Sequence, residues 1–208
     1  MARYTEAICK LCRRHGEKLF LKGTKCATDK CPVARRPFPP GQHGKRRRKD
    51  SNYGLQVREK QKVRRIYGVL ERQFRHYFAI ASKSKGITGE MLLQLLERRL
   101  DNVIYKLNFS ASRSQARQLV KHNLVKVNNR NVNIPSFLVS VGDKIEIKQK
   151  EKIRKSIKEL GEILKDRLIP GWIKPDSAGL KAEIIALPAK TDIGFAVDEN
   201  LIVELYSK

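Results

Sequence analysis

The chain has 208 residues with 40% hydrophobic side chains, and it carries 45 Lys and Arg against 21 Asp and Glu. This hydrophobic content can bury a real core, so the chain is not simply a disordered basic tail. The formal net charge of +24 predicts a polyanionic partner. No apolar run of 18 residues is present and the start MARYTEAICK has no secretory signal, so we expect a cytoplasmic protein.

The positive charge is concentrated in the first 150 residues. Residues 1–50 carry a net +11, residues 51–100 carry +7 and residues 101–150 carry +6, whereas residues 151–208 carry ten charges of each sign. An anionic membrane is one alternative partner, but the termini MARY and LYSK offer neither a lipidation motif nor an amphipathic basic helix. We therefore predict nucleic acid as the partner of the basic part, and contacts to protein or to the rest of the fold for the neutral tail.

All four cysteines lie near the start of the chain in the spacing C-x2-C-x13-C-x4-C, at Cys9, Cys12, Cys26 and Cys31. Two short loops that each offer two sulfurs are typical of a closed tetrahedral thiolate site, so we predict bound Zn²⁺, with an iron–sulfur cluster as the alternative. Disulfides and buried structural thiols are the interpretations without a metal. A segment this short and this charged cannot fold by burying apolar surface alone, so a metal supplies the missing stability under this hypothesis.

A basic extension follows the cysteines. The segment PFPPGQHGKRRRKD has three prolines and two glycines, and therefore no helical or strand period. It contains a block of four positive charges at residues 46–49. A solvated linker is the alternative, but like charges held side by side without a counter-charge repel one another, which favours contact with a phosphate backbone.

The next part of the chain is expected to form three helices. LQVREKQKVRRIY, at residues 55–67, has a basic face and an apolar one, and Gly68 ends it. The segment 71–86 carries aromatic residues such as Phe74 at helical spacing, which favours core packing over stacking on bases. Thr88 then caps a short helix rich in leucine.

Residues 97–134 predict a helix pair followed by a hairpin. Ser112 begins S-x-x-Q, a capping box that starts the second helix. A turn at Asn128 and Asn129 joins two short alternating strands. One basic face on such a compact module suits the shape and phosphates of a folded RNA. The basic residues of the second helix recur every four positions and share one face: Arg113, Arg117 and Lys121.

The remainder of the chain predicts a further strand, a helix and a buried tryptophan. GDKIEIK, at residues 142–148, indicates a turn and an alternating strand that completes the small sheet. IRKSIKELGEILKDR indicates an amphipathic helix that LIPGW breaks. We expect Trp172 to pack in a core with its indole N–H paired.

The segment 97–134 resembles the S4 RNA-binding domain, whose pattern of R-L-D, S-x-x-x-A-R-Q-L-V and V-x-V-N-x-R-x-V it carries. The flanking motifs PPGQHG, REKQKVRRIYG, ERQFR and ENLIVELYSK resemble the bacterial family of small-subunit ribosomal protein S4 almost end to end. The family's hairpin usually has Gly where this chain has Asn129, a residue that tolerates positive φ, so we expect the turn to survive. The resemblance implies a helical domain that is interrupted by the S4 domain and rejoined by the C-terminal segment.

The resemblance implies a structural constituent of the small ribosomal subunit that binds 16S rRNA early, at a helical junction of the 5′ domain. It further implies a role in nucleating assembly, contacts with ribosomal protein S5, and a position near the path by which mRNA enters, which affects decoding accuracy. We find no nucleotide-binding, zinc-protease or nucleophile-elbow motif, and we predict that the protein is not an enzyme. The alternatives are an RNA-modifying or rescue factor built on the same domain and a zinc-finger DNA regulator.

The predicted fold class is α+β, in four parts. Residues 1–45 form a four-cysteine metal module with a basic extension, 46–97 a helical domain, 98–194 the S4 domain with its following helix, and 195–208 a segment that returns to the helical domain. The predicted RNA ligands are basic or polar side chains of these parts: Arg3, Arg13, Arg14, Arg35, Arg36, His43, Lys45, Arg46, Arg47, Arg48, Lys49, Arg58, Lys60, Lys62, Arg64, Arg65, Arg72, Arg99, Ser112, Arg113, Arg117, Lys121, Asn128 and Arg130.

Overall fold

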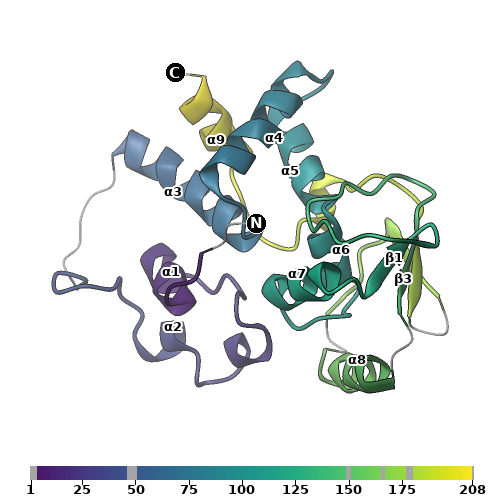
Figure 1. Ribbon diagram of the computed structural model, residues 1–208. Coiled ribbons are helices and arrows are strands. Elements are labelled where there is room, and N and C mark those ends of the chain that lie inside the picture. The colour runs from purple at the N-terminus through teal and green to yellow at the C-terminus, as the bar shows by residue number, and fades with distance from the viewer. Residues whose placement is uncertain (1–3, 46–50, 149–150, 165–166, 177–179, 208) are drawn as a thin grey trace. The chain divides into compact units, whose positions relative to one another are not determined.

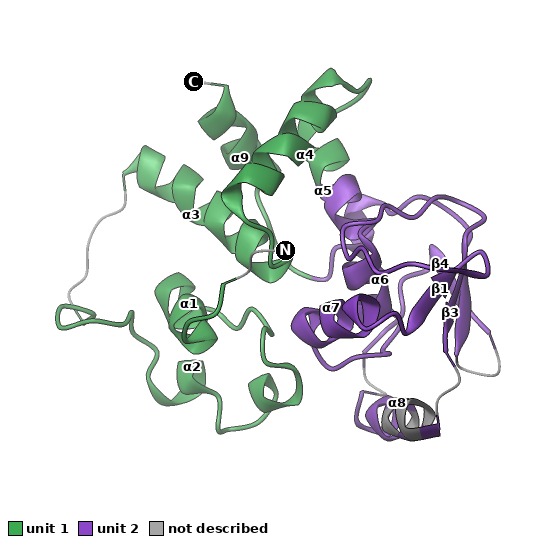
Figure 2. Ribbon diagram, in the orientation of Figure 1, with its two compact units in different colours: residues 1–92, 195–208 green, residues 93–194 purple. Residues whose placement is uncertain are grey.

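The computed structural model of the protein describes residues 4–45, 51–148, 151–164, 167–176 and 180–207 (Figure 1). The chain forms two compact units, the first from residues 1–92 together with 195–208 and the second from residues 93–194 (Figure 2). Helices combined with a small antiparallel sheet confirm the predicted α+β class. Within the described ranges, no helix has the length and apolar character needed to cross a bilayer.

The first unit is helical. The Ser51 hydroxyl accepts a 3.2 Å hydrogen bond from the Gly54 N–H at the start of α3. Gly68 follows that helix with a φ of 63°, as the sequence predicts for a helix stop at this position. The elements are α1 (Ile8–His15), the short 3-10 helix η1 (Gly23–Cys26), α2 (Pro32–Arg35), α3 (Asn52–Ile66), α4 (Glu71–Lys83), the first half of α5 (Thr88–Glu97) and α9 (Glu199–Tyr206).

Helix α9 comes from the far end of the chain and packs against α3 (Figure 1). Gly89 lets α5 approach α9 closely, because an added Cβ would lie 2.5 Å from Cγ of Glu199. Tyr206 anchors the end of α9, since its ring centroid lies 4.6 Å from that of Phe78 and its hydroxyl donates a 2.9 Å hydrogen bond to Glu71. The C-terminal segment is therefore part of the first unit's packing.

Glu71 is the shared acceptor of the first unit. Lys60 and Arg64 each approach its carboxylate to 2.9 Å, and Arg75 approaches it to 3.4 Å. Burial raises the pKa of Glu71, but hydrogen bonds from Lys60 and Tyr206 and the charges of the nearby cations outweigh burial and lower it. One carboxylate thus ties α3, α4 and α9 together.

The second unit joins a helix pair to a five-stranded sheet. The strand order is β2-β1-β3-β5-β4, and every neighbouring pair is antiparallel. The sequence predicts the first three strands but not β4 and β5. The elements are the end of α5, α6 (Leu100–Lys106), α7 (Arg113–Lys121), β1 (Val125–Val127), β2 (Arg130–Asn131), β3 (Lys144–Ile147), α8 (Glu151–Ile163), β4 (Ile173–Pro175), β5 (Lys181–Ile184) and the 3-10 helix η2 (Lys190–Asp192).

The hairpin between β1 and β2 turns at Asn128 and Asn129, whose φ angles are 48° and 65°. Both angles lie in the left-handed region that a two-residue type I′ turn needs and that asparagine tolerates. The Asn128 side chain donates a 2.8 Å hydrogen bond to Asp143 and accepts one of 2.9 Å from the Lys144 N–H. The prediction that Asn129 preserves the turn is confirmed.

The core of the second unit joins α6 and α7 to the sheet. Leu100, Val120, Val125 and Ile145 are fully buried in one apolar cluster. Trp172 belongs to the same cluster at 3% exposure, as predicted. The prediction that its indole N–H is paired is wrong, because among the described residues no acceptor reaches Nε1 in this apolar environment.

Charged groups are also buried in the second unit. Arg99 is 1% exposed, and its guanidinium binds both carboxylate oxygens of Asp101, at 3.1 and 2.7 Å. Glu97, which is fully buried, accepts a 2.7 Å hydrogen bond from Asn102 and lies 3.8 Å from the Lys106 ammonium. Although the sequence predicts Arg99 as an RNA ligand, its burial leaves almost no surface for RNA, so we assign it a structural role.

Replacing Arg99 should therefore lower folding stability. The Arg99→Met variant removes the bidentate partner of the buried Asp101 carboxylate, which keeps Arg117 at 3.9 Å, and breaking a buried pair in this way costs about 3–5 kcal/mol. We expect the free energy of unfolding, measured by urea denaturation, to fall by that amount.

Arg130→Met is the matched control, because Arg130 is an exposed residue of the same unit. Surface substitutions of this kind usually change stability by less than about 0.5 kcal/mol. An Arg99→Met protein that is as stable as the wild type but has lost RNA affinity would contradict the structural role.

Candidate functional site

The four cysteines meet at one small cavity of the first unit. Cys9 and Cys12 come from α1, Cys26 ends η1, and Cys31 directly precedes α2. All four line a cavity of about 10 Å³ together with apolar side chains such as Val33. This is close to the room that a single water occupies. None of the four thiols is part of a disulfide.

Burial sets the chemistry of these thiols. It raises the pKa of Cys12 and of Cys26, and backbone hydrogen bonds from Leu19 and Lys22 partly oppose the rise. Across the described ranges, no group of three or more His, Cys, Asp and Glu side chains is arranged as a set of metal ligands. Four soft sulfur donors at one small cavity fit Zn²⁺ in kind, and the metal stays a prediction.

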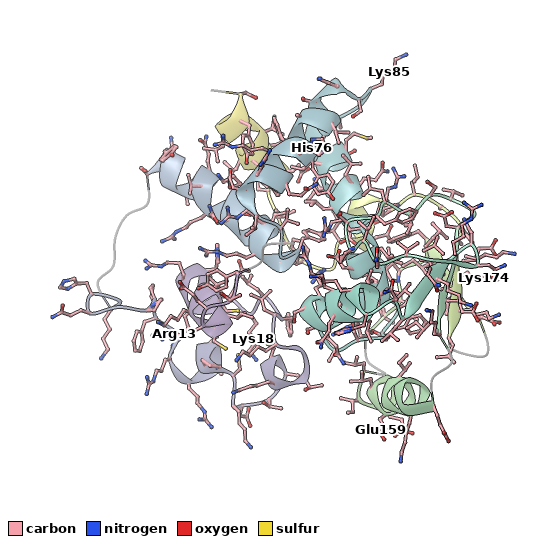
Figure 3. All side chains as sticks on the ribbon, in the orientation of Figure 1. Arg13, Lys18, His76, Lys85, Glu159 and Lys174 are labelled. Carbon is pink, nitrogen blue, oxygen red and sulfur yellow. The ribbon has the colours of Figure 1, made fainter. Side chains whose placement is uncertain are left out.

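Arg13 binds the basic extension back onto α1. Its Nε donates to the carbonyl oxygens of Arg36 and Phe38, at 3.2 and 3.0 Å, and its guanidinium lies 5.1 Å from the centroid of the Phe38 ring (Arg13 is labelled in Figure 3). Lys45 lies 5.7 Å from the same centroid. Gly44 lets the loop close, because an added Cβ would collide with a backbone carbonyl oxygen. Arg13 therefore positions the loop that carries several predicted RNA ligands.

The predicted RNA ligands differ in where the structure places them. Arg3, Arg46, Arg47, Arg48 and Lys49 lie outside the described residues. The side chains that are partly or fully buried are Arg13, Lys60, Lys62, Arg64, Arg65, Arg99, Ser112, Arg113 and Arg117. The residues that are exposed, which we call the exposed set, are Arg14, Arg35, Arg36, His43, Lys45, Arg58, Arg72, Lys121, Asn128 and Arg130.

The cations of α3 that are not exposed contact groups of their own unit. The Lys62 ammonium lies 3.0 Å from the Glu17 carboxylate. Arg65 Nη1 lies 2.7 Å from Nε2 of His15. Burial and the nearby cations, Arg65 first among them, lower the pKa of His15 to about 4, so the ring is neutral at pH 7 and can accept this hydrogen bond. These cations hold α3 against the N-terminal segment.

Ser112 serves as the helix cap that the sequence predicts. Its hydroxyl accepts a 3.3 Å hydrogen bond from the Gln115 N–H. The Gln115 side chain accepts a 2.9 Å hydrogen bond from the N–H of Ala111, one residue earlier than a standard capping box places it. The Ser112 hydroxyl is thus engaged in capping α7, and the residue is 8% exposed.

The predicted basic face of α7 is largely engaged within the second unit. The Arg113 guanidinium lies 4.3 Å from the centroid of the Tyr105 ring. Arg117 Nη1 lies 3.9 Å from the buried Asp101 carboxylate. Both arginines are half-buried, whereas Lys121 is exposed. Of this face, Lys121 is therefore the residue best placed to meet a large partner.

Arg167, which the sequence does not single out, contacts the same Tyr105 ring as Arg113. Its guanidinium lies 4.2 Å from the centroid of the Tyr105 ring, and Nη1 donates a 3.3 Å hydrogen bond to the Tyr105 carbonyl oxygen. Together with Arg113, it places two guanidinium groups on one aromatic ring. The two partners are 62 positions apart in sequence, so no local pattern connects them.

Two known protein families match consecutive parts of the chain. Residues 3–97 match the family described as "Ribosomal protein S4/S9 N-terminal domain". Residues 98–145 match the "S4 domain". The matched residues include the four cysteines, the helices of the first unit up to α5, and the helix pair with its hairpin.

Relatives are similar over their whole length. "Small ribosomal subunit protein uS4" of Ruminiclostridium cellulolyticum is 57% identical over 208 residues, which are 100% of both chains. The protein of the same name from Caldicellulosiruptor saccharolyticus is also 57% identical over 208 residues and 100% of both chains. "Small ribosomal subunit protein uS4A" of Symbiobacterium thermophilum is 54% identical over the same span, again 100% of both chains. The chain therefore belongs to the family of small ribosomal subunit protein uS4.

Proposed function

We propose that the protein is a structural constituent of the small ribosomal subunit and binds 16S rRNA directly. Its membership of the uS4 family over the full length supports this role. The observation that carries the proposal is how the structure distributes its charges. Carboxylates such as Glu71 and Asp101 engage cations inside each unit, while the exposed set stays on the surface, where cations attract phosphate.

The N-terminal segment is the densest part of the proposed interface. Residues 4–45 carry ten Lys and Arg against three Asp and Glu. Arg14, Arg35 and Arg36 are exposed there, and the contact of Arg13 with Phe38 fixes the loop that follows. Fixed cations lose less entropy on binding a phosphate than cations on a mobile tail. Lys121 and Arg130 extend the proposed interface to the second unit.

The family resemblance supports finer proposals about the place of this protein in the ribosome. We propose that it binds early, at a helical junction of the 5′ domain of 16S rRNA, and so helps to nucleate assembly of the subunit. We further propose contacts with ribosomal protein S5 and a position near the path by which mRNA enters, where it contributes to decoding accuracy. The neutral segment 151–208, with ten charges of each sign, suits contacts with protein.

The uS4 family is a family of ribosomal structural proteins rather than of enzymes, and we propose a role without catalysis. An RNA-modifying or rescue factor with an S4 domain is the alternative. An RNA-modifying factor would need a catalytic part beside the S4 domain and a rescue factor a short chain, whereas residues 3–97 match the N-terminal domain of ribosomal S4. Family membership therefore favours the ribosomal role.

We also propose that the N-terminal segment holds one metal centre through Cys9, Cys12, Cys26 and Cys31. The shared cavity of these thiols supports it. Zn²⁺ is the first candidate and an iron–sulfur cluster the second. Either one would act as a structural cross-link between α1 and the segments around η1 and α2. We further propose four parts of the chain. This module spans residues 1–45, the helical domain 46–97, the S4 domain 98–194, and a segment that returns to the helical domain 195–208.

Removing two exposed arginines should make rRNA binding less sensitive to salt. Each phosphate contact releases about one counterion, so Arg35→Gln with Arg36→Gln should make the plot of log affinity against log salt concentration shallower by up to about two. The wild-type affinity itself should fall by roughly three to five powers of ten between about 50 and 200 mM salt, by analogy with DNA. Filter binding to deproteinised 16S rRNA measures both quantities.

The control pair is Lys155→Gln with Lys174→Gln, which removes two exposed charges from the neutral part of the chain. We expect this pair to keep the wild-type slope. Equal changes in slope for both pairs would refute the assignment of Arg35 and Arg36 to the interface, and a flat salt response of the wild type would refute electrostatic binding altogether.

The four-cysteine proposal predicts one bound Zn²⁺, or one iron–sulfur cluster, per purified chain. Cys9→Ser should remove the metal and unfold the N-terminal segment, because apolar burial alone does not hold so short and charged a segment. Elemental analysis, an absorption spectrum and amide hydrogen exchange of residues 4–45 measure these effects. Ala27→Ser is the control, since Ala27 is exposed and adjoins Cys26. Native protein with little metal and four freely titratable thiols would refute the proposal.

A further inference from the structure

Phe20 has a backbone conformation that its side chain disfavours. Among the described residues, five that are not glycine have a positive φ, and four of these are asparagines. The fifth is Phe20, whose φ is 50°. Asparagine tolerates the left-handed region, whereas a bulky residue there is strained and is held only when its surroundings impose it.

The residues on either side of Phe20 impose this conformation. Leu19 is 4% exposed, and its backbone makes a hydrogen bond with the Cys12 thiol. The Lys22 N–H donates a 3.4 Å hydrogen bond to the Cys26 sulfur. Both cysteine loops therefore hold the chain close to Phe20, and the backbone turns at that residue.

The turn presents the Phe20 ring to solvent. Phe20 is 49% exposed, whereas Phe74 of the same unit is fully buried and Phe38 is contacted by two cations. Exposing an aromatic ring forgoes the hydrophobic gain of burial, and here the exposure comes with a strained backbone as well. An exposed ring that is fixed in this way is suited to contact a partner.

The charge around Phe20 indicates the chemistry of that partner. Residues 18–28 contain three lysines and no acidic residue, and Glu17, which precedes them, lies 3.0 Å from the Lys62 ammonium. Lys18 and Lys22, two positions before and after the ring, are exposed (Lys18 is labelled in Figure 3). Lysines close in sequence to an exposed aromatic ring suit the phosphates that neighbour a base, whereas a protein surface would need matching acidic groups.

We propose that Phe20 stacks on an unpaired base of 16S rRNA while Lys18 and Lys22 contact neighbouring phosphates. This inference rests on the proposed function and adds to it a contact with a base, beyond contacts with phosphate. Unpaired bases in RNA loops and bulges are recognised in this way, because every base has a face on which an aromatic ring can stack.

Two variants separate the effect of the Phe20 ring on binding from the effect of the strained backbone on folding. Phe20→Asn removes the ring and introduces a residue that tolerates the positive φ, so the fold should be kept or stabilised. Phe20→Tyr keeps the ring. With deproteinised 16S rRNA, Phe20→Asn should bind roughly 5- to 150-fold more weakly than the wild type, which is the usual effect of losing one base–aromatic stack. Phe20→Tyr should bind within about twofold of the wild type, since its ring still stacks.

The salt dependence distinguishes stacking from charge. Phe20→Asn removes no charge, so its plot of log affinity against log salt should keep the wild-type slope. The control is Leu187→Asn, which removes an apolar side chain of similar exposure, 47%, from the second unit. This control should bind like the wild type. Equal losses for Phe20→Asn and Leu187→Asn would overturn the stacking proposal.

A fluorescence measurement makes the test independent of any change in stability. In Phe20→Trp, addition of rRNA should quench the new tryptophan, while Trp172, which is 3% exposed in the second unit, gives a background that the wild type measures. An unquenched signal at saturating rRNA, or a Phe20→Asn affinity equal to that of the wild type, would overturn the stacking proposal and leave rRNA binding standing. Failure of the wild type to bind would overturn the proposed function itself.

Discussion

The constraint on which this structure depends is a shortage of negative charge, since 21 acidic residues have to serve 45 lysines and arginines. The protein meets this shortage by sharing its carboxylates. Glu71 contacts three cations and a tyrosine hydroxyl, and Asp101 contacts Arg99 and Arg117. Each of these carboxylates sits where several elements meet, so a few acids fix both units. Under the proposed function, the exposed cations neutralise an RNA backbone.

The N-terminal segment is held together differently from the rest of the chain. Its charged sequence offers little apolar surface, and its buried residues gather around four sulfur atoms at one cavity. The backbone hydrogen bond from Lys22 to Cys26 and the contact between Arg13 and Phe38 fix loops that otherwise have no regular structure. This segment therefore has fixed loops in place of a conventional apolar core. The fixed loops hold cations and the exposed Phe20 ring at defined positions.

Local features of the fold could be predicted from the sequence, and long-range partners could not. The stop at Gly68, the cap at Ser112 and the turn at Asn129 each depend on residues within a few positions, so a sequence pattern predicts them. The partner of Arg65 is His15, 50 positions away, and Arg99 looks like any other basic residue until the core around it is known. Strand β5 pairs with β3, so that Ala182 lies opposite Ile145, and no local pattern indicates a partner so distant in the sequence.

The central claim is that the carboxylates pair with cations inside the units while the other cations stay exposed. The salt dependence of the free protein's stability tests this claim most directly. Buried carboxylate pairs are little screened by salt, whereas repulsion among exposed cations is screened strongly. The midpoint of thermal unfolding should therefore rise by about 2–4 °C when sodium chloride is raised from about 0.05 to about 0.5 M, which corresponds to about 1 kcal/mol for a chain of this size. A midpoint that falls over the same range would mean that surface ion pairs hold the fold, and would contradict the claim that the exposed cations are reserved for RNA.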